Sequence, residues 1–148
     1  MLGKVIRLVD TPDFFDEQLD DPEAKIEECK RFCQPGRCVV LLVIQLGRFT
    51  ESEVGILERL EDKLGWRIRH STVVLLTHGE DFNGSVHRFI SERTPLKQIV
   101  EACGHRCHMF RNSSRESRQV IELFKKIPDY DTIFPKLSNK RLPDCNLL

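Results

Sequence analysis

Short apolar runs alternate with longer amphipathic stretches along this chain. The apolar runs predict strands at residues 5–9, 39–44, 72–76 and 106–110. Val39–Ile44 is apolar at every position, which is typical of a strand buried on both faces of a sheet. The chain therefore carries about four predicted strands, and a helical stretch separates each strand from the next.

The stretches between the strands carry helix signals. Asp21 and Pro22 begin the first helix, which stops at a Gln-Pro-Gly turn. Thr50 and Glu53 have the spacing of a capping box, and Gly65 ends the helix that follows. Three more helices are predicted, around residues 86–90, 94–104 and 120–127. This alternation predicts an α/β fold, with a parallel sheet of about four strands and helices on both faces.

The size and charge of the chain narrow its class. Its 148 residues predict one domain over residues 1–128 and a mobile tail over residues 129–148. Lys plus Arg and Asp plus Glu both number 23, so no net field attracts nucleic acid. No apolar run approaches the ~20 residues of a membrane span, and the N-terminus leaves no room for a signal peptide. We therefore expect a cytoplasmic protein without a transmembrane segment.

Six cysteines raise the question of a disulfide scaffold or a metal site. Without a signal peptide, free thiols are expected. The densest cluster, which invites a zinc interpretation, is Cys103, His105, Cys107 and His108. However, a strand here sends alternate side chains to opposite faces, and the sequence has no second close pair of ligands for a tetrahedral site. The cluster therefore favours core packing over zinc.

Polar residues follow three of the predicted strands, at the edge where parallel α/β sheets bind ligands. Asp10-Thr11-Pro12 follows the first strand, Thr77–Asp81 follows the third, and Asn112 follows the fourth. A carboxylate at such an edge has two oxygens that can accept hydrogen bonds from a ligand. An aspartate after a strand is also common as a turn or cap residue. These positions alone leave both interpretations open.

The segment from Leu41 to Glu51 (LLVIQLGRFTE) resembles the distinctive box of the GTPases of immunity-associated protein (GIMAP) family. The resemblance spans about residues 4–127, because Asp-Thr-Pro upstream and Thr-His-Gly-Glu-Asp downstream occur in the right order. It implies a domain of the P-loop GTPase type whose ligand is GTP or GDP.

The resemblance also implies roles for individual residues. Asp10 stands where the family places an acid that reaches magnesium through water. The switch that follows begins with Thr11, Pro12 and Asp13, and Asp13 replaces the usual glycine, so sensing of the γ-phosphate is expected to weaken. Asp81 matches the acid that reads guanine. The other implied nucleotide-binding residues are Thr77, His78, Gly79, Glu80 and, from the last family box, Asn112.

One element of the family pattern does not occur in these residues. The sequence has no Gly-x-x-x-x-Gly-Lys-Ser/Thr loop to hold phosphate. In the family, this loop and the central first strand come ahead of the segment seen here, so we expect an incomplete P-loop GTPase-type domain. With strands ~4.8 Å apart, the missing strand would leave a gap of about 10 Å between residues 5–9 and 39–44. Nucleotide hydrolysis by this chain alone is not expected.

Two functions fit this pattern. The first is a GTP-binding domain of an immunity-associated GTPase, with its base-reading and switch elements retained. The second is a non-hydrolysing interaction module that pairs with full-length family members as a homodimer or heterodimer. Separately, Cys145 lies fourth from the end before a terminal leucine, which is the pattern for geranylgeranylation and peripheral membrane attachment. Asn146 is not aliphatic, so coincidence is the alternative for this motif.

Overall fold

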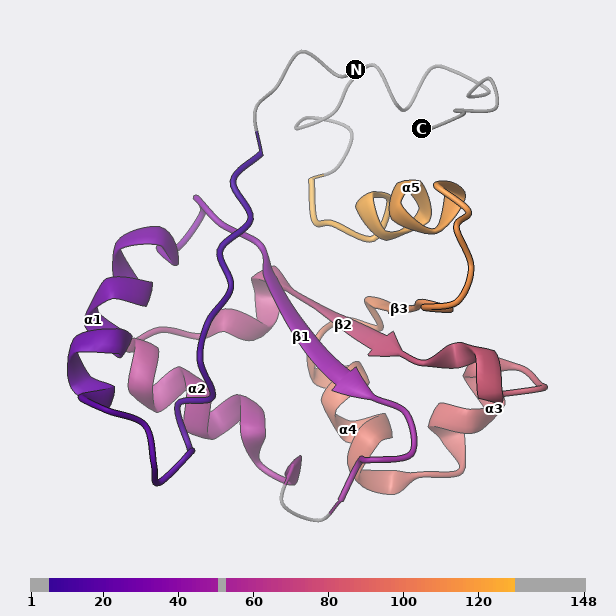
Figure 1. The fold of residues 1–148 in the computed structure, drawn as a ribbon, viewed down its shortest axis with the longest axis horizontal. Helices are drawn as coiled ribbons and strands as arrows, with labels where there is room; N and C mark the ends of the chain where they lie inside the picture. The colour runs from indigo at the N-terminus through magenta and orange to yellow at the C-terminus, as the bar shows by residue number, and fades with distance from the viewer. Residues whose placement is uncertain (1–5, 51–52, 130–148) are drawn as a thin grey trace.

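A parallel sheet forms the centre of the fold in the computed structural model, which describes residues 6–50 and 53–129 (Figure 1). Its strands are β1 (Val40–Gln45), β2 (Thr72–Thr77) and β3 (Cys107–Met109), in the order β1-β2-β3. Val40 pairs with Thr72 and Val74 pairs with Cys107, so all carboxyl ends meet at one edge. Three of the four predicted strands are confirmed to within two residues.

The predicted strand at residues 5–9 does not form over its described part. Residues 6–10 have no regular structure, and the side chain of Leu8 is 83% exposed. Figure 1 shows this indigo segment on the β1 side of the sheet, without joining it. A strand is held by hydrogen bonds to a neighbour and by burial of one face, and no described strand pairs with this segment. The described residues therefore form three strands of the expected sheet of about four.

The helices lie where the sequence predicts them. They are α1 (Pro22–Phe32), α2 (Ile56–Leu64), α3 (Val86–Ser91), α4 (Thr94–Ala102) and α5 (Arg118–Phe124). The Asp21 carboxylate accepts a hydrogen bond from the backbone N–H of Ala24 and caps α1 at its start. The Thr50 backbone N–H donates to the Glu53 carboxylate at 2.7 Å, but regular helix begins only at Ile56 because Gly55 has a left-handed conformation (φ 73°).

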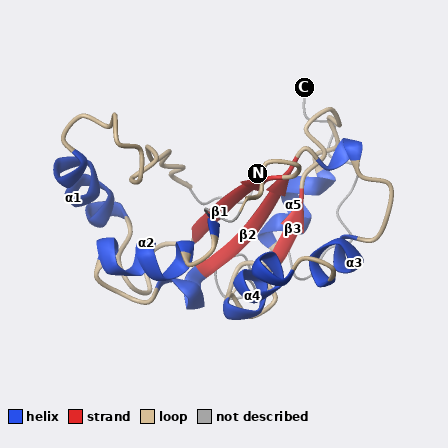
Figure 2. Cartoon of the chain, turned by 90° about the horizontal axis from the view of Figure 1, so that it is seen from below, coloured by secondary structure: helices blue, strands red, loops and turns tan. Residues whose placement is uncertain are grey.

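Helices cover both faces of the sheet (Figure 2). On one face, α2 and α4 enclose the main core, whose buried members include Leu57, Ile68, Leu76 and Leu96. On the other face, α5 places Leu123 against Val73 and Leu75 of β2. This arrangement confirms the α/β fold and is consistent with an incomplete P-loop GTPase-type domain. None of the helices within the described ranges has the length and hydropathy of a membrane span.

The β1 edge of the sheet is poorly covered, and the expectation that Val39–Ile44 is buried on both faces is wrong, because Ile44 is the only buried residue of β1. Val43, in the middle of this strand, is 59% exposed, whereas its register partner Leu75 on β2 is buried. On its other side β1 has no strand neighbour among the described residues. The gap that the sequence predicts beside Val39–Ile44 is therefore left open in the described fold, and its two flanks do not close up.

Candidate functional site

The loops after β2 and β3 are joined at the carboxyl edge of the sheet. The Phe110 backbone N–H donates to the Leu76 carbonyl at 2.7 Å, which continues the ladder beyond β3. After β2, the chain turns at His78, which has a left-handed conformation (φ 61°), and enters a 3-10 turn, η3 (Gly79–Asp81). The Gly79 N–H donates to the Phe110 carbonyl at 2.9 Å. These bonds fix the predicted Thr77–Asp81 loop against the end of β3.

Asn112 connects the two loops through both its side chain and its backbone. Its Oδ1 accepts a hydrogen bond from the His78 backbone N–H at 2.8 Å. Its own backbone N–H donates to Glu80 Oε2, also at 2.8 Å. Within the same loop, His78 Nδ1 lies 3.3 Å from Thr77 Oγ1. The structure thus brings together Thr77, His78, Gly79, Glu80 and Asn112, five of the residues singled out from the sequence.

Gly79 allows the two loops to approach this closely. A Cβ atom at this position would lie 2.6 Å from both Cγ and Sδ of Met109 and 3.1 Å from the Phe110 carbonyl oxygen. Both approaches are closer than ordinary van der Waals contact. Packing against the end of β3 therefore gives a reason for a glycine at this position.

The side chain of Gln119 on α5 also holds the loop after β3 in place. Gln119 Oε1 accepts the Arg111 backbone N–H at 2.6 Å, and Gln119 Nε2 donates to the Arg111 carbonyl at 3.2 Å. The same Nε2 lies 3.5 Å from the Ser114 carbonyl. Sequence reasoning missed this role of Gln119, and it also missed that Glu80 holds Asn112. A single glutamine or glutamate at a helix start or in a loop carries no periodic signal that could have revealed either role.

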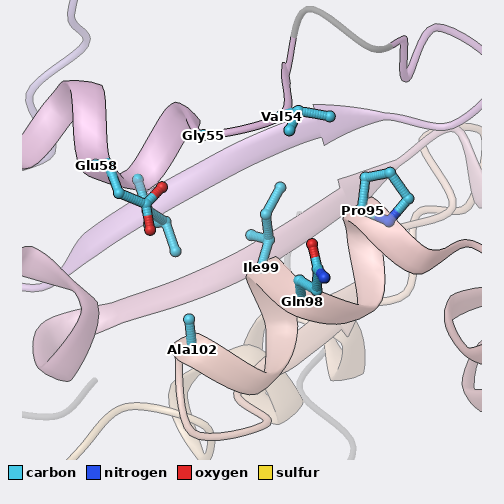
Figure 3. A pocket seen from close by; sticks show the side chains of 8 residues that line it. Val54, Gly55, Glu58, Pro95, Gln98, Ile99 and Ala102 are labelled. Atoms are coloured by element: carbon cyan, nitrogen blue, oxygen red, sulfur yellow. The ribbon is translucent and has the colours of Figure 1, made fainter.

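An open hollow of about 510 Å³ lies beside these loops. Its lining includes Glu80, Met109, Arg111 and Gln119. This volume falls in the range of small-molecule sites, ~300–1,000 Å³. A second, smaller pocket of about 80 Å³ lies between the start of α2 and α4, where Glu58, Ile99 and Gln98 line it (Figure 3). The smaller pocket cannot hold a nucleoside, so the hollow at the carboxyl edge is the better candidate.

The predicted switch does not join this cluster. Asp10, Thr11, Pro12 and Asp13 are exposed, and no hydrogen bond links them to the β2 or β3 loops in the described part of the chain. The Asp13 carboxylate instead accepts the Phe15 backbone N–H at 2.9 Å, and the Asp16 N–H donates to the Asp13 carbonyl at 3.2 Å. These bonds make Asp13 the first residue of a local turn.

The residues considered for zinc are divided between the two faces of the sheet. Cys103 is buried in the main core, and Cys107 packs against it. Burial raises the pKa of Cys103 to about 11 and that of Cys107 to about 12. His108 lies on the α5 face, where its ring meets Phe110 edge-on at 5.4 Å and burial lowers its pKa. Residues 6–50 and 53–129 contain no group of three metal-ligating side chains.

Comparison with known proteins places this fold in a family. The model of the AIG1 family matches residues 1–132. GTPase IMAP family member 8 from Homo sapiens is 32% identical over 139 residues, which cover 86% of this chain and 21% of that protein. The Mus musculus protein of the same name is 29% identical over 128 residues, or 83% of this chain and 18% of that protein.

A plant relative shows the same pattern. Immune-associated nucleotide-binding protein 9 from Arabidopsis thaliana is 26% identical over 132 residues, which cover 84% of this chain and 39% of that protein. The chain thus spans well under half the length of these relatives. The resemblance found in the sequence motifs is confirmed: the chain belongs to the AIG1 family, with a domain of the GIMAP type.

Proposed function

We propose that this chain is a guanine-nucleotide-binding domain whose base-reading loops are preformed. The observation that carries the proposal is the double connection of Asn112 to His78 and Glu80, because it fixes the loop after β2 at the ligand-binding edge of the sheet. Because the loop is already ordered, less conformational entropy is lost when a ligand binds. The names of the relatives, GTPase and nucleotide-binding protein, support the same ligand class.

Asp81 gives the proposed site its specificity. It ends the 3-10 turn that the Gly79 and Asn112 bonds hold in place. A carboxylate can accept from guanine N1–H and the 2-amine together, whereas adenine offers neither donor. Asn112 Oδ1 already accepts from His78, and no hydrogen bond to the described residues uses Asn112 Nδ2. We assign this Nδ2 as a donor to the base.

The phosphate side of the proposed site is weak in this chain. A phosphate loop supplies several charge-assisted hydrogen bonds, each worth ~1.5–3 kcal/mol. Without three of them, binding loses about 5–9 kcal/mol, which would move a micromolar Kd beyond millimolar. For magnesium, Asp10 is the one candidate that the sequence offers, and a single exposed carboxylate does not form a site. We therefore derive no magnesium-dependent step and propose binding without hydrolysis.

Thermal unfolding with added nucleotides tests the proposal. Because the Kd is expected to lie beyond millimolar, GDP or GTP at tens of millimolar should raise the unfolding midpoint of the purified chain, and ATP at the same concentration should not. Asp81→Asn should abolish the effect of GDP and create a response to xanthosine diphosphate, because an amide can donate to the 2-oxo group of xanthine. Asp62→Asn, at an exposed position on α2, is the matched control. Equal responses to GDP and ATP, or none to either, would reject the base-reading site.

The uncovered β1 edge favours a second candidate function, an interaction module that pairs with another AIG1-family chain. Strand β1 has no charged residue, and Val43 is exposed at the centre of this strand. Unpaired strand edges of this kind pair with other chains. Light scattering over a concentration series tests this idea with a second copy as partner. Val43→Lys should then weaken the dimer, whereas Val120→Lys on α5 should not, and a monomer at every concentration would contradict self-pairing.

Prenylation of the C-terminal segment, which the sequence predicts, can be measured directly. Residues 130–148, including Cys145, lie outside the described residues. We propose Cys145 as a prenylation site, which would make the protein a peripheral membrane protein of the cytoplasmic side. Intact mass after expression in a eukaryotic host tests this directly, and an unmodified Cys145 would contradict it.

A further inference from the structure

Two cysteine side chains lie close together in the turn that connects α1 to β1. Cys33 is the residue that ends α1, and Cys38 lies two positions before β1 begins at Val40. Their Sγ atoms are 3.4 Å apart. The Cys38 thiol also lies 3.5 Å from the Gln34 carbonyl. The turn between them contains Gly36 in a left-handed conformation (φ 73°), which folds the chain back so that the two sulfurs face each other.

The backbone around Cys33 is held in place on two sides. Its N–H donates to the Cys29 carbonyl at 2.9 Å, which completes the last turn of α1. Its carbonyl accepts the indole N–H of Trp66 at 3.1 Å. Because these bonds fix the Cys33 main chain, the approach of the two sulfurs is a feature of the folded domain. The two sulfurs, now 3.4 Å apart, would have to approach to ~2.05 Å to form a disulfide.

We propose that Cys33 and Cys38 are a redox modification site and form a reversible disulfide between the end of α1 and the start of β1. With a peroxide as oxidant, the Cys38 thiolate attacks one peroxide oxygen and becomes a sulfenic acid, and water leaves. The Cys33 sulfur then gives up its proton and attacks the Cys38 sulfur, and a second water leaves. Overall two thiols and one hydrogen peroxide give one disulfide and two waters. A dithiol reductant reverses the step.

The order of attack follows from the surroundings of the two thiols. Burial and the neighbouring Cys38 raise the pKa of Cys33 to about 12, so Cys33 is a poor first nucleophile. Both thiols are half-buried, and Cys38 lies in the turn outside the helix, so we take Cys38 as the sulfur that the oxidant attacks first. Cys29, one turn earlier on α1, has its pKa raised by burial and by the nearby Cys38, but no hydrogen bond joins these two sulfurs in the described residues, whereas Cys33 and Cys38 are in contact. The geometry therefore selects Cys33 as the resolving partner.

Tryptic mapping of the full chain after peroxide treatment tests the pairing. Trypsin separates the three cysteines of this region, because Cys29, Cys33 and Cys38 fall in peptides 26–30, 32–37 and 38–48. The expected product is peptide 32–37 linked to peptide 38–48, lost on treatment with dithiothreitol. Trp66 is the only tryptophan and bonds to Cys33, so its fluorescence should change with the same time course. A loop this short should raise the unfolding midpoint by on the order of 5 °C.

Matched variants separate this pair from nonspecific oxidation. Cys29→Ser should leave the linked peptide and the fluorescence change intact, and Cys38→Ser should abolish both. If Cys38→Ser fails to fold, the map of the native sequence still decides the question. A link between peptides 26–30 and 38–48 would overturn the proposal, as would full alkylation of Cys33 and Cys38 after oxidation. A link that forms only in denaturant would also overturn it.

Discussion

The Glu80 carboxylate accepts the backbone N–H of Asn112 at 2.8 Å and thereby joins the loop after β2 to the loop after β3. The two residues are 32 positions apart in the sequence. Both belong to the segments that the family resemblance marks as base-reading. Their contact makes the two loops one structural unit, and several measurable consequences depend on it.

Removal of the Glu80 carboxylate should loosen this unit. Glu80→Ala is expected to lower the free energy of unfolding by about 1–2 kcal/mol, since it leaves the Asn112 N–H without its charged acceptor. Denaturant unfolding measures this loss, and hydrogen exchange should quicken at the Asn112 amide. Glu80→Gln keeps an acceptor oxygen and should restore most of the stability. Glu116→Ala, at an exposed position, is the control, and an equal effect of both alanine variants would contradict the prediction.

A side chain at Gly79 should push the loops apart. Gly79→Ala places a methyl group within 2.6 Å of Met109 and 3.1 Å of the Phe110 carbonyl, so we expect a loss of about 1–3 kcal/mol. Gly84→Ala is the comparison, because its Cβ would meet only the movable Phe82 ring, at 3.2 Å. Chemical denaturation of the two variants checks the difference. A Gly79→Ala variant as stable as the parent would show that Met109 moves aside without cost.

His108 should make stability fall in mild acid. Burial lowers its pKa in the folded chain below the ordinary 6.5, and its Nε2 is buried without a hydrogen-bond partner in the described residues. The unfolded chain therefore binds this proton more readily, so the stabilisation is complete above about pH 6.5 and is lost as the pH falls toward the lower folded pKa. Unfolding midpoints between pH 7.5 and 5.5 should drop, and His108→Gln should flatten that drop. His87→Gln, at an exposed position on α3, should leave the slope unchanged.

The ion pair of Arg69 with Glu61 should matter more than its pair with Glu58. Arg69 Nε and Nη2 donate to both Glu61 oxygens, at 2.9 and 2.7 Å, and Glu61 is only 11% exposed. The Arg69 hydrogen bonds lower the pKa of Glu61 below 4.5, so this stabilisation is present above that pH and is lost as the carboxylate protonates in acid.

Two neutral variants separate these pairs. Glu61→Gln is expected to cost about 2 kcal/mol at neutral pH, because Arg69 would keep a partly buried charge with only the exposed Glu58 as its ionic partner. Glu58→Gln should cost under ~0.5 kcal/mol, because Glu58 is 63% exposed and makes one bond at 3.2 Å. Urea unfolding at neutral pH measures both. Equal costs would mean that the pairing with Glu61 contributes nothing special.

Periodicity was enough to predict most of the fold. The run at Thr72–Leu76 became β2, which is buried along its length, and the run at Val39–Ile44 became β1 because it pairs with β2, although Ile44 is its only buried residue. The run at residues 5–9 has the same pattern but forms no strand over residues 6–9, because strand formation depends on a neighbour as well as on the residue type. The hydrophobic pattern of a segment indicates which face of a strand would be apolar, but it does not show whether a neighbouring strand is present to pair with it.

The sequence predicted which residues belong to the candidate site, but it did not predict the hydrogen bonds between them. Strand ends indicate that Thr77 and Asn112 share an edge, since parallel strands end on the same side. The hydrogen bond between Asn112 Oδ1 and the His78 N–H depends on the left-handed turn at His78, which no residue type dictates. The separation of Asp10 from this edge was likewise not predictable, because it follows from the missing strand pairing of the N-terminal segment.

Gln119 has a consequence that reaches beyond the strength of its own hydrogen bonds. It sits on α5 and holds Arg111 at both backbone groups, and Arg111 is the residue directly before Asn112. The loop after β3 is thus fastened to the last described helix of the chain, on the opposite face from the main core. A displacement of α5 by little more than an ångström would break these bonds, and the loop would then be held through the bonds of Asn112 to His78 and Glu80. Helix α5 is therefore mechanically coupled to the carboxyl edge of the sheet.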